Sequence, residues 1–278
     1  MSAILSQLNS HYRDEQIRFY ASGHKYEILS DIGSKYVSVT TWNHGHFPKF
    51  DADAIIRNIM SGKNWNETNK YWGMTSSQIK ASWKKSGDSA SCSGTNLHER
   101  IENFMNNDKL EEKYTNRDLI EKYEEKKSDN LEVYVEEKEW VYFLDFVRSN
   151  PLLKPYRTEW MIYDEDIKIA GSIDMVYEND DGTLSIYDWK RCKEISSENP
   201  FRKFASNPLI SSIPDTNYWH YALQLNTYKS ILERKYGKEI VSLHLVRLHP
   251  DADGYELIDL PILEDAVIAL YEERLSKI

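Results

Sequence analysis

The sequence is poor in cysteine, and this scarcity excludes two kinds of stabilised architecture. Cys92 and Cys192 are the two cysteines among 278 residues, and neither belongs to a CxxC pair. Such a chain supports neither a disulfide framework nor a zinc site built from cysteine pairs. We therefore expect a reduced, intracellular protein.

Long apolar runs and an overall positive charge are also missing. No apolar run approaches the roughly 18 residues that a membrane span requires, and the N-terminal segment MSAILSQLNSHYRDEQ is too polar for a signal peptide. The formal net charge of −10 argues against a protein that coats nucleic acid through its overall charge. An enzyme with a local basic groove remains open, because a metal site made of carboxylates itself adds negative charge.

What the chain does have is the balance of an ordinary globular domain. Hydrophobic residues make up 40% and charged residues 29%, and single α/β domains commonly reach this length. The 19 Tyr and 8 Trp suit a sizeable core, and they also suit base stacking. No internal repeat is evident, and no linker forces a second domain.

Hydrophobic periodicity predicts alternating helices and strands. Residues 24–41 alternate around a turn at 31–33 and predict a β-hairpin. Helical patterns cover residues 50–60, 78–85, 94–105, 140–147, 218–236 and 263–275. Strand patterns cover residues 156–163, 167–177, 183–189 and 241–248. Thr95 is expected to cap the third helix. The sequence NDDG at 179–182 predicts a hairpin turn between two of the strands. The mixed charges of 106–139 predict a solvated helical segment or a mobile insertion. Residues 190–216 are predicted to form a polar loop.

Two aspartates and a lysine lie on two of the predicted strands, within the segment GSIDMVYENDDGTLSIYDWK (171–190). Asp188 and Lys190 project to the same face because side chains two apart in a strand do so. A hairpin partner brings Asp174 beside them. Asp188 ends an apolar strand, where a charge is costly without a purpose. Taken alone, this pattern also fits an ordinary hairpin with charges on its exposed face.

These residue types suit phosphodiester hydrolysis. Mg²⁺ prefers carboxylate oxygens, and bound ions stabilise charge on a phosphate and lower the pKa of an attacking water. A neighbouring lysine can orient that water or offset the charge of the transition state. The backbone carbonyl of Trp189 offers one more oxygen ligand.

Two helical pairs accompany this segment. His98 and Glu102 lie four residues apart on the helix predicted at 94–105, and Gln224 and Tyr228 are one turn apart on the helix predicted at 218–236. Each pair alone fits an ordinary amphipathic helix. Together with Glu159, they complete the ordered set GTxxHxxxE, Glu159, GxxD, DxK and QxxxY.

This ordered set resembles the RecB-like branch of the PD-(D/E)xK nucleases. The branch includes RecB nuclease domains, CRISPR-associated RecB-like nucleases and the mitochondrial genome-maintenance exonuclease, and lambda exonuclease is a more distant relative. The resemblance covers roughly residues 90–250. It implies an α/β fold with a restriction-endonuclease-like core, a central mixed sheet flanked by helices. We expect this core over 91–278, with residues 1–90 as an N-terminal extension packed on it.

The resemblance also implies a role for each matched residue. His98, Asp174, Asp188 and the Trp189 carbonyl would bind Mg²⁺ or Mn²⁺, and Glu102 is a further candidate. The chain has no four-cysteine set, so the iron–sulfur cluster of some relatives is not expected.

The remaining matched positions act on the reaction rather than on the ion. Lys190 would be the catalytic lysine, and Gln224 and Tyr228 would support the site and contact DNA. Glu159 aligns with an acidic residue that often precedes GxxD in this branch, and it would support the site.

Further residues are candidates for holding nucleic acid. Arg191, Lys193, Arg202 and Lys203 follow the site closely and could line a phosphate track, although such spacing is also common in loops. Side chains of a second group could stack bases or offer hydroxyls at a strand end, and equally could pack: Trp72, Trp83, Trp219 and the segment 38–42.

The resemblance implies a Mg²⁺- or Mn²⁺-dependent deoxyribonuclease, an exonuclease that acts on DNA ends in replication, recombination or repair. The alternatives are a structure-specific or flap endonuclease of the same superfamily, and a non-catalytic DNA-binding protein with the same fold. An RNA substrate also stays open. Similar leading segments occur in virus- and phage-type recombination exonucleases, which hints at a viral or phage-like origin. A recombination or replication protein is a candidate partner.

Overall fold

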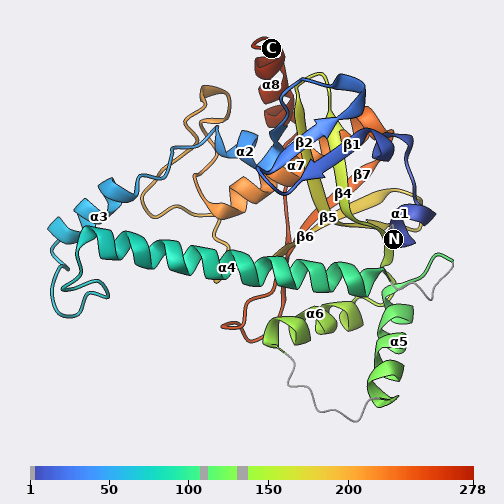
Figure 1. The fold of residues 1–278 in the computed structure, drawn as a ribbon, viewed down its shortest axis with the longest axis horizontal. Coiled ribbons are helices and arrows are strands. Elements are labelled where there is room, and N and C mark those ends of the chain that lie inside the picture. The colour runs from blue at the N-terminus through green and yellow to red at the C-terminus, as the bar shows by residue number, and fades with distance from the viewer. Residues whose placement is uncertain (1–3, 107–111, 130–136) are drawn as a thin grey trace.

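The computed structural model describes residues 4–106, 112–129 and 137–278. Its centre is a six-stranded mixed sheet in the order β3–β5–β6–β7–β8, with β4 paired to the other edge of β5 (Figure 1). The β4–β5, β5–β6 and β7–β8 pairs are antiparallel, whereas β3–β5 and β6–β7 are parallel. The predicted α/β fold, a mixed sheet flanked by helices, is confirmed.

The strands of this sheet are β3 (Val37–Ser38), β4 (Lys154–Asp164), β5 (Ile169–Glu178), β6 (Leu184–Lys190), β7 (Ile240–Arg247) and β8 (Glu256–Asp259), and a separate hairpin consists of β1 (Ile17–Tyr20) and β2 (Lys25–Ile28). The helices are α1 (Ile4–Leu8), α2 (Val39–His44), α3 (Ala52–Ser61), α4 (Ser76–Met105), α5 (Asn116–Asp129), α6 (Lys138–Ser149), α7 (Asn217–Tyr236) and α8 (Glu264–Leu275).

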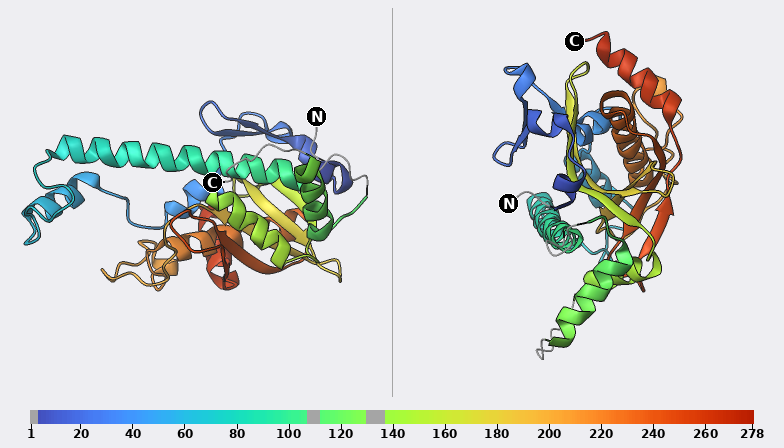
Figure 2. Two further views of the ribbon diagram at one scale, coloured as in Figure 1. Left: turned by 90° about the horizontal axis from the view of Figure 1, so that it is seen from below. Right: turned by 90° about the vertical axis from the view of Figure 1, so that its right-hand side faces the viewer.

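Helices cover both faces of the sheet, so its inner strands are apolar on both sides. On one face, α2, α7 and α8 pack against residues such as Ile173 and Ile186. On the other face, α6 and the C-terminal part of α4 pack against Met175, Tyr187 and Trp189. Figure 2 shows the two helical layers on opposite sides of the strands. This double cover explains why β6 reads as an almost continuous apolar run around Asp188.

Most of the predicted elements are confirmed, with ends that differ by a few residues. These are α3, α6, β4, β5, β6, α7, β7 and α8. The NDDG turn is also present: Asn179 N donates to Thr183 O at 2.8 Å, and Gly182 supplies a φ of +84°. The sequence predicted these segments well because apolar residues recur in each at the spacing of its secondary structure, or fill most of it where a strand is covered on both faces. It missed α1, α2 and β8, which are short.

The hairpin predicted over 24–41 is wrong. The hairpin that forms pairs β1 with β2, four residues against four, from Ile17↔Ile28 to Tyr20↔Lys25. A turn is present at Asp31, where Ser34 N donates to the Asp31 carbonyl at 3.3 Å, but β2 pairs with β1 rather than with the strand after this turn. The Asp31 carboxylate accepts from Ser34, Tyr36 and Lys168. The chain then adds β3 to the edge of β5 and enters α2.

The two helices predicted at 78–85 and 94–105 are one helix, α4. Thr75 caps it in a capping box with Gln78. The expected cap at Thr95 is therefore wrong, and the Thr95 hydroxyl donates instead to the Ser91 carbonyl at 3.1 Å within the helix. Ser, Gly and Thr look like helix breakers in the sequence, but this stretch stays helical because α4 is anchored at both ends. The domain boundary predicted at residue 90 falls inside this helix.

The charged segment is partly described. Residues 116–129 form α5, as the helical alternative predicted, but Leu119 and Ile120 are buried against α6 and its neighbours rather than solvated. The rest of that prediction, at 107–111 and 130–136, lies outside the described residues. Among the helices in the described part, none has the length and hydropathy to cross a bilayer.

Candidate metal centre

Three neighbouring strands carry the acidic residues of the candidate site. Glu159 lies on β4, Asp174 on β5 and Asp188 on β6. The antiparallel register of β4 and β5 flanks the first two with the pairs Thr158↔Met175 and Trp160↔Ile173, so Glu159 and Asp174 face each other. Asp188 is buried, and Asp174 and Glu159 are half-buried.

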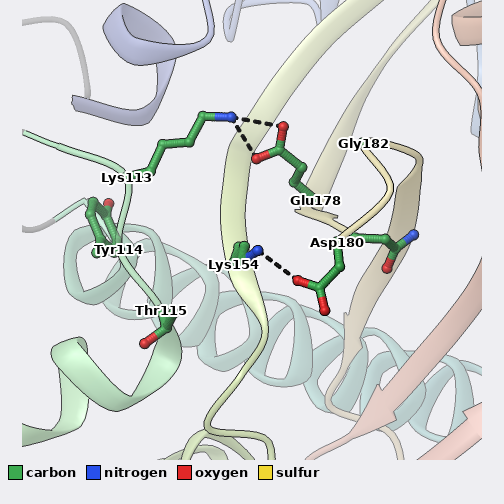
Figure 3. A pocket seen from close by; sticks show the side chains of 8 residues that line it. Lys113, Tyr114, Thr115, Lys154, Glu178, Asp180 and Gly182 are labelled. Atoms are coloured by element: carbon green, nitrogen blue, oxygen red, sulfur yellow. Dashed lines mark hydrogen bonds and ion pairs between the residues drawn. The ribbon is translucent and has the colours of Figure 1, made fainter.

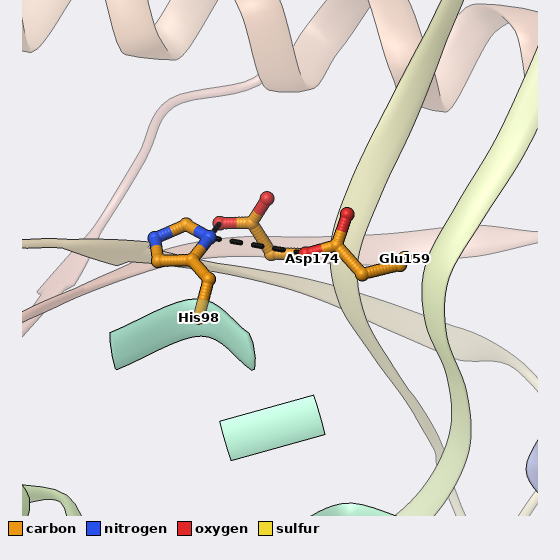
Figure 4. A group of neighbouring side chains, drawn as sticks. All are labelled: His98, Glu159 and Asp174. Atoms are coloured by element: carbon orange, nitrogen blue, oxygen red, sulfur yellow. Dashed lines mark ion pairs between the residues drawn. The ribbon is translucent and has the colours of Figure 1, made fainter. Parts of the chain in front are cut away.

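Helix α4 brings His98 to these strands. Leu97, Ile101 and Met105 are buried and fix the helix on the sheet. The His98 Nδ1 atom then lies 3.5 Å from Asp174 Oδ2 and 3.8 Å from Glu159 Oε1. Ligand atoms of these three residues all lie within 4.8 Å of one another, and Figure 4 shows the three side chains converging from α4, β4 and β5.

The backbone of Trp189 determines which nitrogen of His98 faces the carboxylates. The Trp189 carbonyl lies 3.0 Å from His98 Nε2, and a carbonyl can only accept, so Nε2 carries a proton. A neutral His98 therefore directs the lone pair of Nδ1 at two carboxylates. That contact is favourable only with a cation between the groups or a second proton on the ring. The Trp189 amide also donates to Asp174 Oδ2 at 3.0 Å.

Lys190 leans back onto Asp188 rather than out to solvent. Its ammonium forms an ion pair with Asp188 Oδ2 and lies 4.7 Å from the centre of the Tyr221 ring. Tyr221, on α7, is a site residue that the sequence analysis missed. Its position, three residues before Gln224 on the same helix, was the available signal.

Burial and mutual repulsion shape the titration of the site. Burial first, and then the Asp174 carboxylate, raise the pKa of Asp188 to about 6. Burial also raises the pKa of Asp174. For His98, burial lowers the pKa, but the Asp174 and Glu159 carboxylates outweigh it and raise it to about 9. For Lys190, burial is likewise outweighed by Asp188 and Asp174, and its pKa is raised.

The donor set fits a divalent cation. Three carboxylates share the site with one ammonium and with the His98 imidazolium, so ionisation of all three carboxylates leaves a net negative charge. Carboxylate oxygens with one imidazole suit Mg²⁺ or Mn²⁺ better than a soft metal. His98, Asp174 and Glu159 could hold such an ion, with Asp188 beside Asp174. Glu159, expected as a supporting residue, thus lies among the potential ligands.

Glu159 adopts an unusual backbone conformation. Its φ is +42°, in the left-handed region, which costs a residue with a side chain on the order of 1–3 kcal/mol. The Ser172 hydroxyl donates to Glu159 Oε2 at 3.0 Å and helps to hold the carboxylate. Strain of this kind persists where the surrounding contacts enforce it.

Glu102, the further candidate for a ligand, lies outside the three-residue group. It lines an open depression of about 660 Å³ together with Gly94, His98, Glu99 and Glu159. Burial, followed by the negative charge of Glu159, raises its pKa. Its carboxylate is thus part of the approach to the cluster.

Gln224 and Tyr228 lie beneath the site on α7. Gln224 Nε2 donates to the Tyr228 hydroxyl at 3.3 Å. The Tyr228 ring is buried against Gly171, where an added Cβ would come within 2.7 Å of Tyr228 Cε1. Burial raises the pKa of Tyr228 well above its usual value, so the hydroxyl stays protonated. The glycine of the GxxD segment is explained by this close approach.

The basic residues that could line a phosphate track differ in their partners and exposure. Arg191 is tied to Glu139 on α6, with 2.7 Å between Nε and Oε1 and little exposure of either side chain. Lys193 is exposed and paired with Asp251 at 2.8 Å. Arg202 and Lys203 are exposed at the tip of the 190–216 loop. Arg191 therefore packs structurally, and the loop-tip pair faces solvent.

The other candidate contact residues also differ in burial and in their hydrogen bonds. Ser38 caps α2, and Trp42 is buried in the core. The Trp219 indole donates to the Ser197 carbonyl at 3.0 Å, and that of Trp83 to the Tyr71 hydroxyl at 2.8 Å. Trp72 is exposed.

A second hollow, of about 350 Å³, lies at the β5–β6 turn (Figure 3). Its charges are paired within its own wall: Lys113 contacts Glu178 at 2.6 Å, and Lys154 contacts Asp180 at 2.6 Å. The four charged side chains of this hollow are therefore already paired with one another.

Comparison with known proteins gives little beyond the geometry. No protein-family profile matches the chain, and no curated protein matches it. Among solved structures, SSO0001 shares 22% identity over 44% of this chain and 50% of its own, with a TM-score of 0.24. A protein from Eubacterium rectale named "putative exonuclease" shares 12% identity over 60% of this chain and 69% of its own, with a TM-score of 0.31. The chain thus spans half the length of SSO0001, and overlaps of this quality do not establish a common family.

Proposed function

We propose that this protein is a metal-dependent deoxyribonuclease of the PD-(D/E)xK type. The observation that carries the proposal is the convergence of His98, Glu159 and Asp174 beside a buried Asp188–Lys190 ion pair. Placing so many ionisable groups in one partly buried site is costly unless they act together on a ligand.

In this proposal His98, Asp174, Glu159 and Asp188 hold Mg²⁺ or Mn²⁺. The ion would stabilise negative charge on the scissile phosphate and make a bound water more acidic. The protein's own part is to fix the ligands. The Trp189 carbonyl orients the His98 ring, and the Trp189 amide holds one oxygen of Asp174.

Lys190 would act as a cation rather than as a base. Its pKa is raised by Asp188 and Asp174 despite burial, so it keeps its proton at neutral pH. A protonated ammonium beside the metal ligands can donate to a phosphate oxygen and offset charge in the transition state. The contact of its Nζ with the Tyr221 ring, at 4.7 Å from the centroid, limits where this ammonium can go.

Gln224 and Tyr228 would support the strands from below. Tyr228 fills the space over Gly171, three residues before Asp174. Gln224, which is partly exposed, would contact a substrate phosphate. Action on DNA ends, in replication, recombination or repair, completes the proposal.

Digestion of end-labelled linear DNA with Mg²⁺ tests this function. We expect wild-type protein to release labelled products and EDTA to stop it, and Asp188→Asn and Lys190→Met to lower the rate by at least about a hundredfold. Asp259→Asn, at an exposed aspartate on β8, is the matched control and should keep full activity. Full activity of the Asp188 and Lys190 variants would refute the assignment of the site.

The same assay separates the alternatives. A closed circular DNA that stays intact while the linear form is degraded supports the exonuclease, whereas nicking of the circle supports an endonuclease. Binding of DNA without turnover in either metal would point to a non-catalytic protein. An RNA strand of the same sequence tests the remaining substrate class.

A further inference from the structure

Residues 48–85 form a projection, here called the arm, that differs in charge from the rest of the chain. The arm contains α3, the turns after it and the first part of α4. Seven Lys and Arg stand against three Asp and Glu, a net charge of +4, in a chain whose net charge is −10. Figures 1 and 2 both show α3 and the start of α4 extending away from the sheet. A basic projection on an acidic protein is a candidate for contact with a polyanion.

Most of the positive charge on the arm is available to a ligand. Lys80 and Lys84 are paired with Asp53 and Asp88 at 2.6 and 2.7 Å. The remaining cations are exposed and, within the described parts of the chain, form no ion pair: Lys49, Arg57, Lys63, Lys70 and Lys85. Unpaired cations on one projection favour the binding of a nucleic acid, because they neutralise its phosphates and release its counterions.

The arm also presents aromatic rings that its small core does not need. Ile56 and Ile79 are its buried hydrophobic residues. In contrast, Phe50 is 74% exposed and Trp72 is 46% exposed. Trp72 stands edge-on to Trp65 with 5.5 Å between ring centres. Exposed rings among cations are the combination that binds single-stranded nucleic acid, because each base offers a face for stacking.

The tip of the 190–216 loop repeats this chemistry beside the arm. Phe201 is 80% exposed and Phe204 is 45% exposed, and they flank Arg202 and Lys203. The loop is hydrogen-bonded to the chain just before the arm, since the amides of residues 206 and 207 donate to the His46 carbonyl at 2.8 and 3.1 Å. Both figures show the loop and the arm projecting on the same side of the sheet. The two aromatic and basic sets therefore project on the same side of the sheet.

Helix α4 links the arm to the candidate metal centre. Between Ile79 and Leu97 no residue of α4 is buried, so this part of the helix is accessible to solvent from the arm to the turn that carries His98. From Lys85 to His98 it covers about 20 Å at the usual rise of 1.5 Å per residue. A nucleic-acid strand held on the arm would reach the candidate metal centre along this part of α4.

We propose that the arm and the loop tip bind single-stranded nucleic acid and feed it to the metal centre. The proposal rests on the proposed nuclease function for its purpose, but the binding itself does not require cleavage. A single strand is favoured over a duplex because exposed rings can stack only on accessible bases. The net negative charge of the remaining surface would also repel the denser charge of a duplex.

Fluorescence anisotropy with labelled oligo-dT, in EDTA so that no turnover occurs, tests the proposal on the full chain. We expect Trp72→Ala and Phe201→Ala each to weaken binding by at least about fivefold. Tyr20→Ala, at a 45% exposed ring on the β1–β2 hairpin, is the matched control and should bind as the wild type does. Lys63→Glu combined with Lys70→Glu should weaken binding and flatten its dependence on salt, whereas Lys25→Glu on that hairpin should not.

The outcomes separate the possible occupants. Equal affinities for oligo-dT in the arm variants and the wild type would overturn the proposal, as would equal losses with a blunt duplex. A loss of self-association in the Trp72→Ala protein, measured by sedimentation, without a change in oligo-dT affinity would overturn it in favour of a second copy of the chain. The charge variants keep the test valid if removal of Trp72 disturbs the arm. Because cleavage is not measured, an inactive protein can still satisfy or fail this test.

Discussion

Replacing Gly171 by alanine tests the contact that ties α7 to the candidate site. The added Cβ would lie 2.7 Å from Tyr228 Cε1, 3.1 Å from its hydroxyl oxygen and 3.3 Å from Cζ. Ordinary van der Waals contact begins at 3.4 Å, so the ring must retreat by about 0.7 Å. It cannot do so freely, because Tyr228 is buried among the core residues of α7 and the sheet.

Overpacking of this kind typically costs about 1–3 kcal/mol. For a chain of this size, that corresponds to a fall in Tm of roughly 2–10 °C. Chemical denaturation followed by tryptophan fluorescence gives the change in the free energy of unfolding. We also expect cleavage of linear DNA to fall, because the displaced ring changes its contact with Gln224 and with the strand that carries Asp174.

Two further proteins make the reasoning refutable. Gly254→Ala adds the same methyl group where no atom lies within 4 Å, and it should leave the Tm unchanged. The double variant Gly171→Ala, Tyr228→Leu should lose less stability than the sum of the two single changes, because the shorter side chain relieves the clash. A Gly171→Ala protein as stable as the wild type, or additive losses in the double variant, would show that the contact is not as tight as described.

Three other predictions address the metal centre, the Arg191 ion pair and the acid stability of the fold. Adding Mn²⁺ at about a hundred times its Kd to EDTA-treated protein should stabilise it by about 2.7 kcal/mol in thermal denaturation, and Asp174→Asn should abolish the effect; an unchanged gain in that variant would remove Asp174 from the ligands. Arg191→Met should lower the free energy of unfolding by on the order of 1–3 kcal/mol because Glu139 loses its partner, while oligo-dT affinity stays the same; a selective loss of affinity would restore Arg191 to the phosphate track. Hydrogen bonds from Lys168, Ser34 and Tyr36 lower the pKa of Asp31 to about 2 from 3.8, so the contribution of Asp31 to stability is complete above pH 3.8 and is lost as the pH falls through 2. The Asp31→Asn protein should therefore be less stable than the wild type at pH 7 and should lose less stability on acidification. Parallel curves of Tm against pH for the two proteins would contradict this prediction.

Local pattern was sufficient to predict the central hairpin. Apolar, β-prone runs on either side of the NDDG turn predicted β5 and β6. The period of two in a strand placed Asp188 and Lys190 on one face. Helical periodicity predicted α7 and so put Gln224 and Tyr228 one turn apart. These predictions depend on neighbours in sequence, and such neighbours are fixed by backbone geometry.

Pattern was insufficient where distant contacts decide a local conformation. The turn that begins at Asp31 was read as the centre of a hairpin, although the Asp31 carboxylate is held by Lys168, which is distant in the sequence, and the chain continues into β3. The serine- and glycine-rich middle of α4 was read as a break, although its ends are anchored by Ile79 and Leu97. Neither anchor lies within the stretch whose propensity is poor.

For the candidate site, the sequence alone determined which residue types are available and that Asp174, Asp188 and Lys190 share a hairpin. The tertiary structure decided which other side chains lie beside these three. It brought Glu159 beside His98 and Asp174 across the β4–β5 pair, set Tyr221 over Lys190, and assigned Arg191 to an ion pair with α6. The physical reason is that a carboxylate or a guanidinium gains most of its free energy from the charge it meets in space, and that partner is set by sheet register and helix packing rather than by separation along the chain.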